Sequence, residues 1–191
     1  PTSILAAVSY TLSLNLTSVN GGTDENATND ALSQSFTIVS GAANDICADA
    51  TTLTLNAAYV TANNTVTCTD GPDPSCGGGG MKDVWYKFTY TGGDITIQTN
   101  SGSMADTRLA IYEDCTLTNQ LGCNDDISTT NYNSRINLTC AQLTNGMTYY
   151  IQAGGYATGT GTFGIQVLAT TIAGCTNVNA CNYNECATSN N

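Results

Sequence analysis

The sequence predicts an all-β protein, an antiparallel β-sandwich stapled by disulfides. Three observations predict it: short runs that alternate apolar and polar residues, turn residues between those runs, and cysteines spread along an Asn- and Thr-rich chain. Alternation with a period of two is typical of a strand with one buried face. Several such runs separated by turns indicate a sandwich. No segment with a period of 3.6 predicts a long helix.

Residues 1–40 are predicted to form a strand arm followed by a linker. Between residues 8 and 19 the chain reads VSYTLSLNLTSV, in which apolar residues alternate with Ser, Thr and Asn. The apolar row of this predicted assembly strand is Val8, Tyr10, Leu12, Leu14 and Leu16. Residues 20–34 are polar and turn-rich, which predicts a linker or long loop before a strand at 35–39. An overlong strand with such a linker is suited to pair with the sheet edge of a neighbouring subunit.

Residues 41–170 carry the short strands of the predicted sandwich. The expected strands are 52–56, 84–91, 94–99, 107–112, 134–138, 148–153 and 161–168. The Gly92-Gly93 pair predicts a tight hairpin turn between two of them. Residues 69–81, TDGPDPSCGGGGM, are expected to be a surface loop tied at Cys76, because two prolines and a run of four glycines do not fit regular structure.

Nine cysteines predict a disulfide framework made in an oxidising compartment. They are Cys47, Cys68, Cys76, Cys115, Cys123, Cys140, Cys175, Cys181 and Cys186. The odd count leaves one thiol free, bridged to another chain, or paired with a cysteine outside this sequence. A Cys115–Cys123 bridge is the preferred pairing in the middle of the chain, where it would staple a hairpin. Residues 171–191 form a Cys-rich tail with little apolar content, so its stability is expected to come from cross-links or from a neighbour.

Composition and charge exclude several functions. Lys and Arg total 4 against 15 Asp and Glu, the formal net charge is -11, and histidine is absent. Nucleic-acid binding needs a basic surface that this chain lacks. Without histidine, Ser-His and Cys-His nucleophiles are excluded, so we predict no catalytic residues and a non-enzyme. No long apolar run predicts a membrane span. A chain that opens on Pro1 without a signal sequence is expected to be a mature polypeptide, exported to the extracellular space or the cell surface.

Several motifs occur in the order found in a known family. They are NDICADA (44–50), DVWYKFT (83–89), ITIQT (95–99), DTRLAIY (106–112), CNDD (123–126), YYIQAGGY (149–156) and GTFGIQV (161–167). Residues 44–168 thereby resemble the pre-peptidase C-terminal module, a jelly-roll β-sandwich of large secreted surface proteins, especially of Bacteroidota. The tail GCTNVNACNYN (174–184) resembles a short cysteine motif of the same proteins. The resemblance implies a non-catalytic spacer, adhesive unit or appendage, and it carries over no catalytic residue.

Residues 106–126 combine five carboxylates with two cysteines. Asp125 and Asp126 are adjacent and Asp106 opens the preceding strand, so their oxygens, with that of Asn124, can converge on a hard cation. Calcium is the expected ion, because it is bound by carboxylate, amide and backbone oxygens. The alternative is that Asp and Asn fill turns and cap strand ends. A glycosidase pair is disfavoured, since adjacent solvated aspartates would both ionise.

Three functions remain open at the level of the sequence, and none requires a cofactor. The first is a structural or adhesive subunit of a filament or surface assembly, which associates with itself or with a neighbouring surface protein. The second is a carbohydrate-binding module with exposed tyrosines, and the third is a passive appendage of a secreted enzyme. The tyrosines considered for glycan contact are Tyr86, Tyr132, Tyr149, Tyr156 and Tyr183. Trp85, the single tryptophan, is expected in the core.

Overall fold

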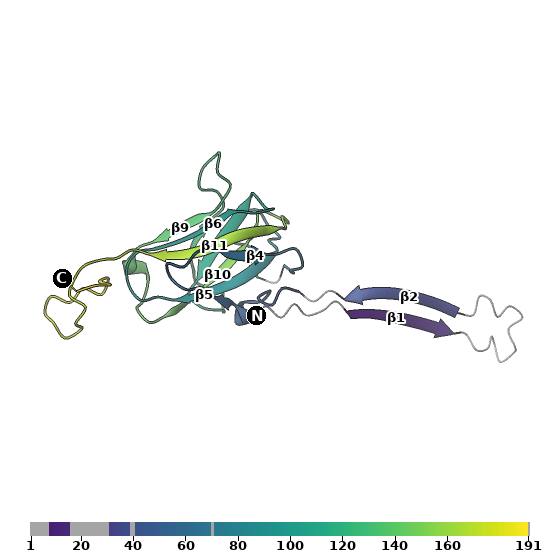
Figure 1. Cartoon of the computed structure of the whole chain (residues 1–191), viewed down its shortest axis with the longest axis horizontal. Coiled ribbons are helices and arrows are strands. Elements are labelled where there is room, and N and C mark those ends of the chain that lie inside the picture. Colours follow the sequence, from purple (N-terminus) through teal and green to yellow (C-terminus); the bar gives the residue numbers. More distant parts are fainter. Residues whose placement is uncertain (1–7, 16–30, 39–40, 70, 191) are drawn as a thin grey trace, which may run out of the picture. The chain divides into compact units, whose positions relative to one another are not determined.

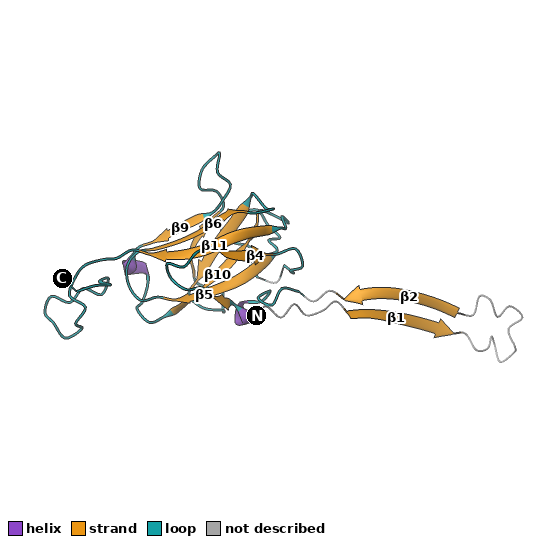
Figure 2. Ribbon diagram, in the orientation of Figure 1, coloured by secondary structure: helices purple, strands orange, loops and turns teal. Residues whose placement is uncertain are grey.

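The computed structural model describes residues 8–15, 31–38, 41–69 and 71–190. The chain divides into two compact units, Pro1–Ser40 and Gly41–Asn191 (Figure 1). Strands dominate the described part of the chain (Figure 2). Its helices are the 3₁₀ turns η1 (Cys47–Asp49) and η2 (Cys140–Gln142). Within the described residues, no helix is long and apolar enough to cross a membrane.

The first unit contains a two-stranded antiparallel sheet. β1 (Val8–Asn15) pairs with β2 (Ala31–Ile38) in one continuous register. The predicted strand is confirmed over residues 8–15, whereas Leu16 lies outside the described residues. The prediction of a linker at 20–34 is wrong for residues 31–34, which belong to β2. The apolar alternation resumes there and gives β1 a partner within its own chain.

The second unit is a β-sandwich of two sheets, which confirms the predicted fold class. The first sheet has the strand order β3 (Thr51–Thr52), β5 (Asp83–Thr89), β10 (Thr148–Gly155), β7 (Thr107–Tyr112) and β8 (Gln120–Asn124). The second has the order β4 (Val60–Asn63), β11 (Thr162–Ala169), β6 (Ile95–Ser101) and β9 (Arg135–Leu138). Neighbouring strands are antiparallel, except that β3 runs parallel to β5.

The main core lies between the two sheets, where alternate residues of each strand meet. The five-stranded sheet contributes Phe88, Leu109 and Ile151, and the four-stranded sheet contributes Ile97 and Ile165. Each of these five side chains is 0% exposed. Full burial of such a side chain contributes about 1.5 to 3 kcal/mol. The period of two therefore encodes this interior, as the sequence predicts.

The Gly92-Gly93 pair joins the two sheets and does not close a hairpin. β5 before it pairs with β3 and β10, whereas β6 after it pairs with β11 and β9. The two glycines have φ values of +112° and +81°, a region that glycine enters at little cost. The predicted hairpin is wrong because alternating strands around a glycine turn fit a sheet-to-sheet connection equally well.

Three short strands also differ from the prediction, and one of them is β8, since no strand was expected at residues 120–124. The strand expected at 52–56 ends after Thr52, because the chain leaves the sheet and inserts Leu53 into the core. β4 was not predicted. Ala62 is the one buried residue among its four, so its sequence carries little apolar alternation.

Two loops cover the outer face of the five-stranded sheet. Trp85, Ala110 and Tyr112 lie on this face and form a second apolar cluster with Cys47 and Ala50. The disulfides Cys47–Cys115 and Cys76–Cys123 bind the loops around residues 41–50 and 71–81 to the β7–β8 hairpin. Their Cα–Cα distances, 5.7 and 5.8 Å, are ordinary for disulfides. Trp85 is buried, as predicted, but beneath this cover and not between the sheets.

The predicted Cys115–Cys123 bridge is therefore wrong. Both cysteines belong to the β7–β8 hairpin region, but each is bonded to a loop from earlier in the chain. The physical reason is the apolar outer face of the sheet, which must be shielded from water. Segments distant in sequence supply the shield, and the disulfides fix it in place.

A third disulfide, Cys140–Cys186, bonds the tail to the sandwich. Gly93 N also donates a hydrogen bond to Cys186 O at 3.1 Å. All nine cysteines lie in the described part of the chain, and Cys68, Cys175 and Cys181 have no disulfide partner there. The structure thus leaves three thiols unpaired, where the odd count predicted one.

Candidate functional site

Asp106, Asp125 and Asp126 meet at one end of the five-stranded sheet. Asp106 precedes β7, and the other two follow β8. Because β7 and β8 are antiparallel neighbours, with Leu109 opposite Asn124, the start of β7 and the end of β8 coincide. One carboxylate oxygen of each aspartate lies within 4.8 Å of those of the other two. The structure therefore brings these three predicted residues together.

Buried hydroxyl groups hold the cluster in place. Ser134 Oγ donates to Asp125 O at 2.8 Å. Ser134 N donates to Thr99 Oγ1 and Thr107 Oγ1 at 2.9 and 3.0 Å, and all three residues are buried. Thr107 directly follows Asp106, so the hydroxyl groups of Thr99, Thr107 and Ser134 together hold the chain at both Asp106 and Asp125. Sequence reasoning missed these residues because Ser and Thr are abundant throughout the chain.

Asn124 uses its side chain within the loop. Its Oδ1 accepts a hydrogen bond from Arg135 N at 2.7 Å, and its Nδ2 donates to Asp126 O at 3.1 Å. These bonds fix the path of residues 124–126. Asn124 therefore helps to position the carboxylates.

Each aspartate of the cluster has a buried oxygen without a partner. Oδ1 of Asp106, Asp125 and Asp126 accepts no hydrogen bond from any described residue. Burial raises the pKa of Asp106, and the charge of Asp126 raises it further. Burial also raises the pKa of Asp125, as do its two aspartate neighbours, while the Arg108 guanidinium lowers it. Negative charge is thus disfavoured here until a cation compensates for it.

The donor set fits a hard cation. Ca²⁺ binds oxygen at about 2.3 to 2.6 Å, so ligands on opposite sides of one ion lie roughly 4.6 to 5.2 Å apart. The three carboxylate oxygens, all within 4.8 Å of one another, satisfy this condition. A purely oxygen donor set favours calcium or magnesium over the transition metals. Backbone carbonyls and water would complete the coordination of calcium.

Arg108 is fully buried on β7, close to this cluster. Its Nε donates to Met81 Sδ at 3.3 Å, and its Nη2 lies 3.8 Å from Asp73 Oδ1. Neither Nη1 nor Nη2 has a hydrogen-bond partner among the described residues. Gly78, at φ +92°, passes so close to Nη1 that a side chain there would collide with it. Gly78 is therefore part of the cover over Arg108, a role that the composition of the glycine run did not predict.

The tyrosines predicted for glycan contact divide into two groups. Tyr86 and Tyr149 are buried in the main core, so the prediction is wrong for them. They lie two residues from other inward-facing residues of their strands, Phe88 for Tyr86 and Ile151 for Tyr149, and so share the inner face of the sheet. Tyr132, Tyr156 and Tyr183 are exposed. Tyr59, which the sequence did not single out, is 38% exposed.

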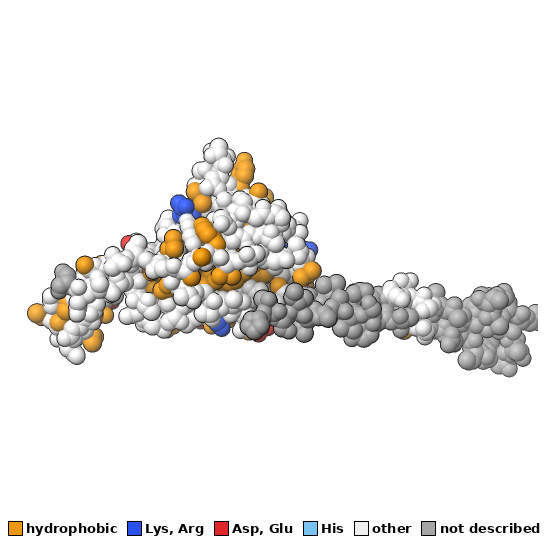
Figure 3. Space-filling view, viewed as in Figure 1, with side chains coloured by type: hydrophobic (Ala, Val, Ile, Leu, Met, Phe, Trp, Pro, Cys, Tyr) orange, Lys and Arg blue, Asp and Glu red, His pale blue; other side chains and the backbone are white. Residues whose placement is uncertain are grey.

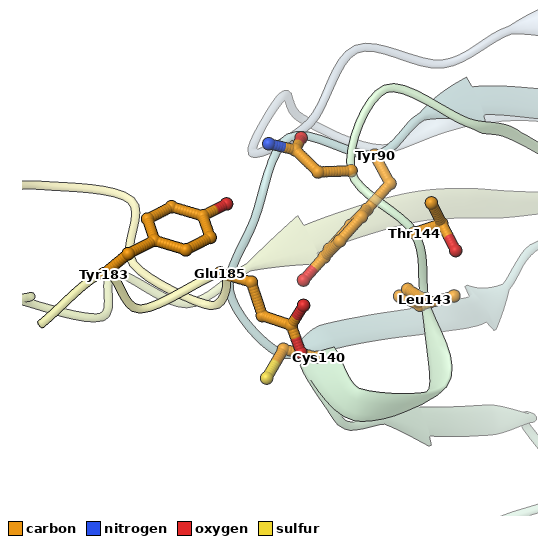
Figure 4. Close-up of a pocket in the computed structure, with 7 residues that line it drawn as sticks. Tyr90, Cys140, Leu143, Thr144, Tyr183 and Glu185 are labelled. Carbon is orange, nitrogen blue, oxygen red and sulfur yellow. The ribbon is translucent and has the colours of Figure 1, made fainter. Parts of the chain in front are cut away.

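Two hollows are found on the described surface of the second unit. One, of about 210 Å³, lies between the tail and the sandwich. Figure 4 shows Tyr183 and Glu185 of the tail on one side of it and Tyr90 and Leu143 on the other. The second hollow, of about 300 Å³, contains Tyr59 and lies over β4, β11 and β6.

No protein-family model matches this chain, and no curated protein matches it. Among solved structures, the chain is similar to the pre-peptidase C-terminal domain of collagenase from Bacillus anthracis, at 15% sequence identity and a TM-score of 0.43. The similarity covers 62% of this chain and 93% of that one. That domain bears the name of the module that residues 44–168 resemble in their motifs.

Proposed function

We propose that this protein is a non-catalytic building block of an extracellular structural or adhesive assembly, joined to its neighbours through the β1–β2 hairpin. The main observation in support of this proposal is that Leu12, in the middle of an alternating apolar row, is 56% exposed. Exposed apolar rows and open strand edges are surfaces that another chain can cover. Three disulfides support a location in an oxidising compartment outside the cell.

The register of the hairpin separates apolar from polar residues. Residues directly opposite each other in an antiparallel pair share a face. On one face the pairs are Val8–Ile38, Tyr10–Phe36, Leu12–Gln34 and Leu14–Leu32. On the other they are Ser9–Thr37, Thr11–Ser35, Ser13–Ser33 and Asn15–Ala31. The hairpin is therefore amphipathic, with all its aromatic and large aliphatic residues in one set of pairs.

A partner would stabilise this unit. A two-stranded hairpin by itself is at best marginally stable in water. Covering its apolar face would increase the stability of the hairpin, since each large apolar side chain contributes about 1.5 to 3 kcal/mol on full burial. A second copy of the chain presents the same surface and can supply the cover.

The test compares the full-length protein with variants by light scattering coupled to size-exclusion chromatography and by negative-stain electron microscopy. Deletion of residues 1–40 and Leu12→Lys are both expected to abolish assembly, because each removes the apolar joint. Ser13→Lys places the same charge on the neighbouring, polar-face residue and should assemble normally. Assembly that survives both the deletion and Leu12→Lys refutes the joint. A wild-type protein that is monomeric throughout supports the alternative, an accessory or carbohydrate-binding module of a larger secreted protein.

We also propose that calcium braces the sandwich through Asp106, Asp125 and Asp126. The supporting observation is the set of three buried carboxylate oxygens without partners. Calcium at about 100 times its Kd is expected to stabilise the fold by about 2.7 kcal/mol, seen as a higher Tm than in EDTA. Asp126→Asn should reduce this gain, while Asp49→Asn, an exposed aspartate outside the cluster, should keep it. Equal Tm values in calcium and in EDTA contradict the brace.

A further inference from the structure

We propose that the hollow around Tyr59 and Asn100 is a binding subsite for a neutral glycan chain. It lies on the outer face of the four-stranded sheet, away from the main core. It is lined by Tyr59, Thr61, Asn100, Ser101, Gly102, Thr162, Phe163 and Gly164, and its volume is about 300 Å³. This inference does not depend on the proposed assembly, since none of these residues belongs to the hairpin.

A glycine on the central strand forms the floor of the hollow. Gly164 of β11 is directly opposite Thr61 of β4 and Asn100 of β6. A side chain at Gly164 would collide with Asn100 Oδ1 and come within 3.1 Å of Tyr59 Cδ1. The missing side chain therefore lets the Tyr59 ring, from just before β4, and the Asn100 amide, from β6, approach the backbone of β11 from either side. A ligand in the hollow would therefore contact the Tyr59 ring and the Asn100 amide, which lie over the Gly164 backbone.

The polar groups around this floor match sugar hydroxyls. No described residue forms a hydrogen bond with the side chain of Asn100 or Thr61. An amide offers a donor and an acceptor side by side, and a hydroxyl offers both, which is what neighbouring sugar hydroxyls require. The exposed ring of Tyr59 offers an apolar surface with a polar edge, on which the apolar face of a pyranose can pack.

The charge of the site selects among glycans. No charged side chain lines the hollow. The face of the sandwich seen in Figure 3 likewise carries mostly uncharged side chains. The whole chain has a net charge of -11, which repels uronic-acid and sulfated polymers. A neutral polysaccharide meets neither an unpaired charge nor long-range repulsion at this surface.

Affinity electrophoresis of the full-length protein tests the proposal. The gels contain neutral soluble polysaccharides, namely a β-1,3-glucan, a xyloglucan, a galactomannan and a mannan, or an acidic one, alginate. At least one neutral polymer is expected to retard the protein, and alginate is not. Tyr59→Ala and Asn100→Ala should each weaken Kd about tenfold or more in titration calorimetry with the matching oligosaccharide.

Controls make the result specific to the hollow. Tyr132→Ala removes a 50% exposed tyrosine that does not line it and should leave Kd unchanged. Gly164→Ala should block binding although it removes no group that contacts the glycan. If circular dichroism shows that this variant has an altered fold, the Kd values of the Tyr59→Ala and Asn100→Ala variants, whose substitutions are at exposed residues, decide the test. Absence of retardation by every neutral polymer, retardation by alginate alone, or an equal loss in Tyr132→Ala overturns the proposal.

Discussion

The disulfide pairing makes a quantitative prediction for the variant Cys115→Ala/Cys123→Ala. In the structure these cysteines belong to two different bridges, with sequence separations of 68 and 47 residues. The double substitution therefore removes two long-range cross-links and frees the loops that cover Trp85. If the same cysteines were bonded to each other, it would remove a single short-range staple.

The two pairings differ clearly in their effect on stability. In the chain-entropy model, closing loops of 68 and 47 residues stabilises the fold by about 4 kcal/mol each at 25 °C. The two loops overlap, so about 8 kcal/mol is an upper bound for their joint loss. A local bridge over eight residues is worth roughly 2 to 3 kcal/mol. Since a domain has a total stability of about 5 to 15 kcal/mol, the larger loss is enough to unfold it.

Urea denaturation measures this difference. Fluorescence of Trp85, the single tryptophan, reports on the covered face, and far-ultraviolet circular dichroism reports on the sheets. Cys68→Ala, which removes an unpaired thiol, is the control and should change the free energy of unfolding little. A loss of only 2 to 3 kcal/mol, together with a non-reduced peptide map that links Cys115 to Cys123, refutes the covering role of these bridges.

Three further predictions concern the site, the buried arginine and the tail. In EDTA, the free energy of unfolding should fall as the pH rises from about 3.8 through the raised pKa values of Asp106 and Asp125, because the folded state holds their protons more tightly than the unfolded state does. Urea titrations at successive pH values measure this slope. Added calcium, or the double substitution Asp106→Asn/Asp125→Asn, should make the slope flatter. Arg108→Met should lower the free energy of unfolding, because it leaves Asp73 and Asp125 without the compensating positive charge, and Arg108→Ala should lower it by about 2 to 4 kcal/mol more through a cavity. An unchanged or higher value for Arg108→Met in urea titrations would show that the buried charge does not stabilise the fold. Cys140→Ala/Cys186→Ala should release the tail, seen as faster hydrogen exchange confined to residues 171–190, and unchanged exchange there would mean that other contacts hold it.

Local patterns in the sequence were enough to predict much of the sandwich. Alternation of apolar and polar residues has the same period as side chains along a strand, so runs such as 95–99 identify both the strand and its buried face. The same local logic placed Asp106 beside Asp125 and Asp126, because a strand and its hairpin neighbour bring their outer ends together.

The sequence alone therefore determined most of the longer strands of the sandwich, the exclusion of histidine chemistry and the proximity of the three aspartates, all of which depend on residue type and short-range spacing. Tertiary structure alone decided that Gly92-Gly93 connects two sheets, that Cys115 and Cys123 have distant partners, and that Tyr59 lies over Gly164. These features depend on which strand becomes the neighbour of which. That choice comes from burying both faces of the five-stranded sheet at once, a condition no short stretch of residues contains.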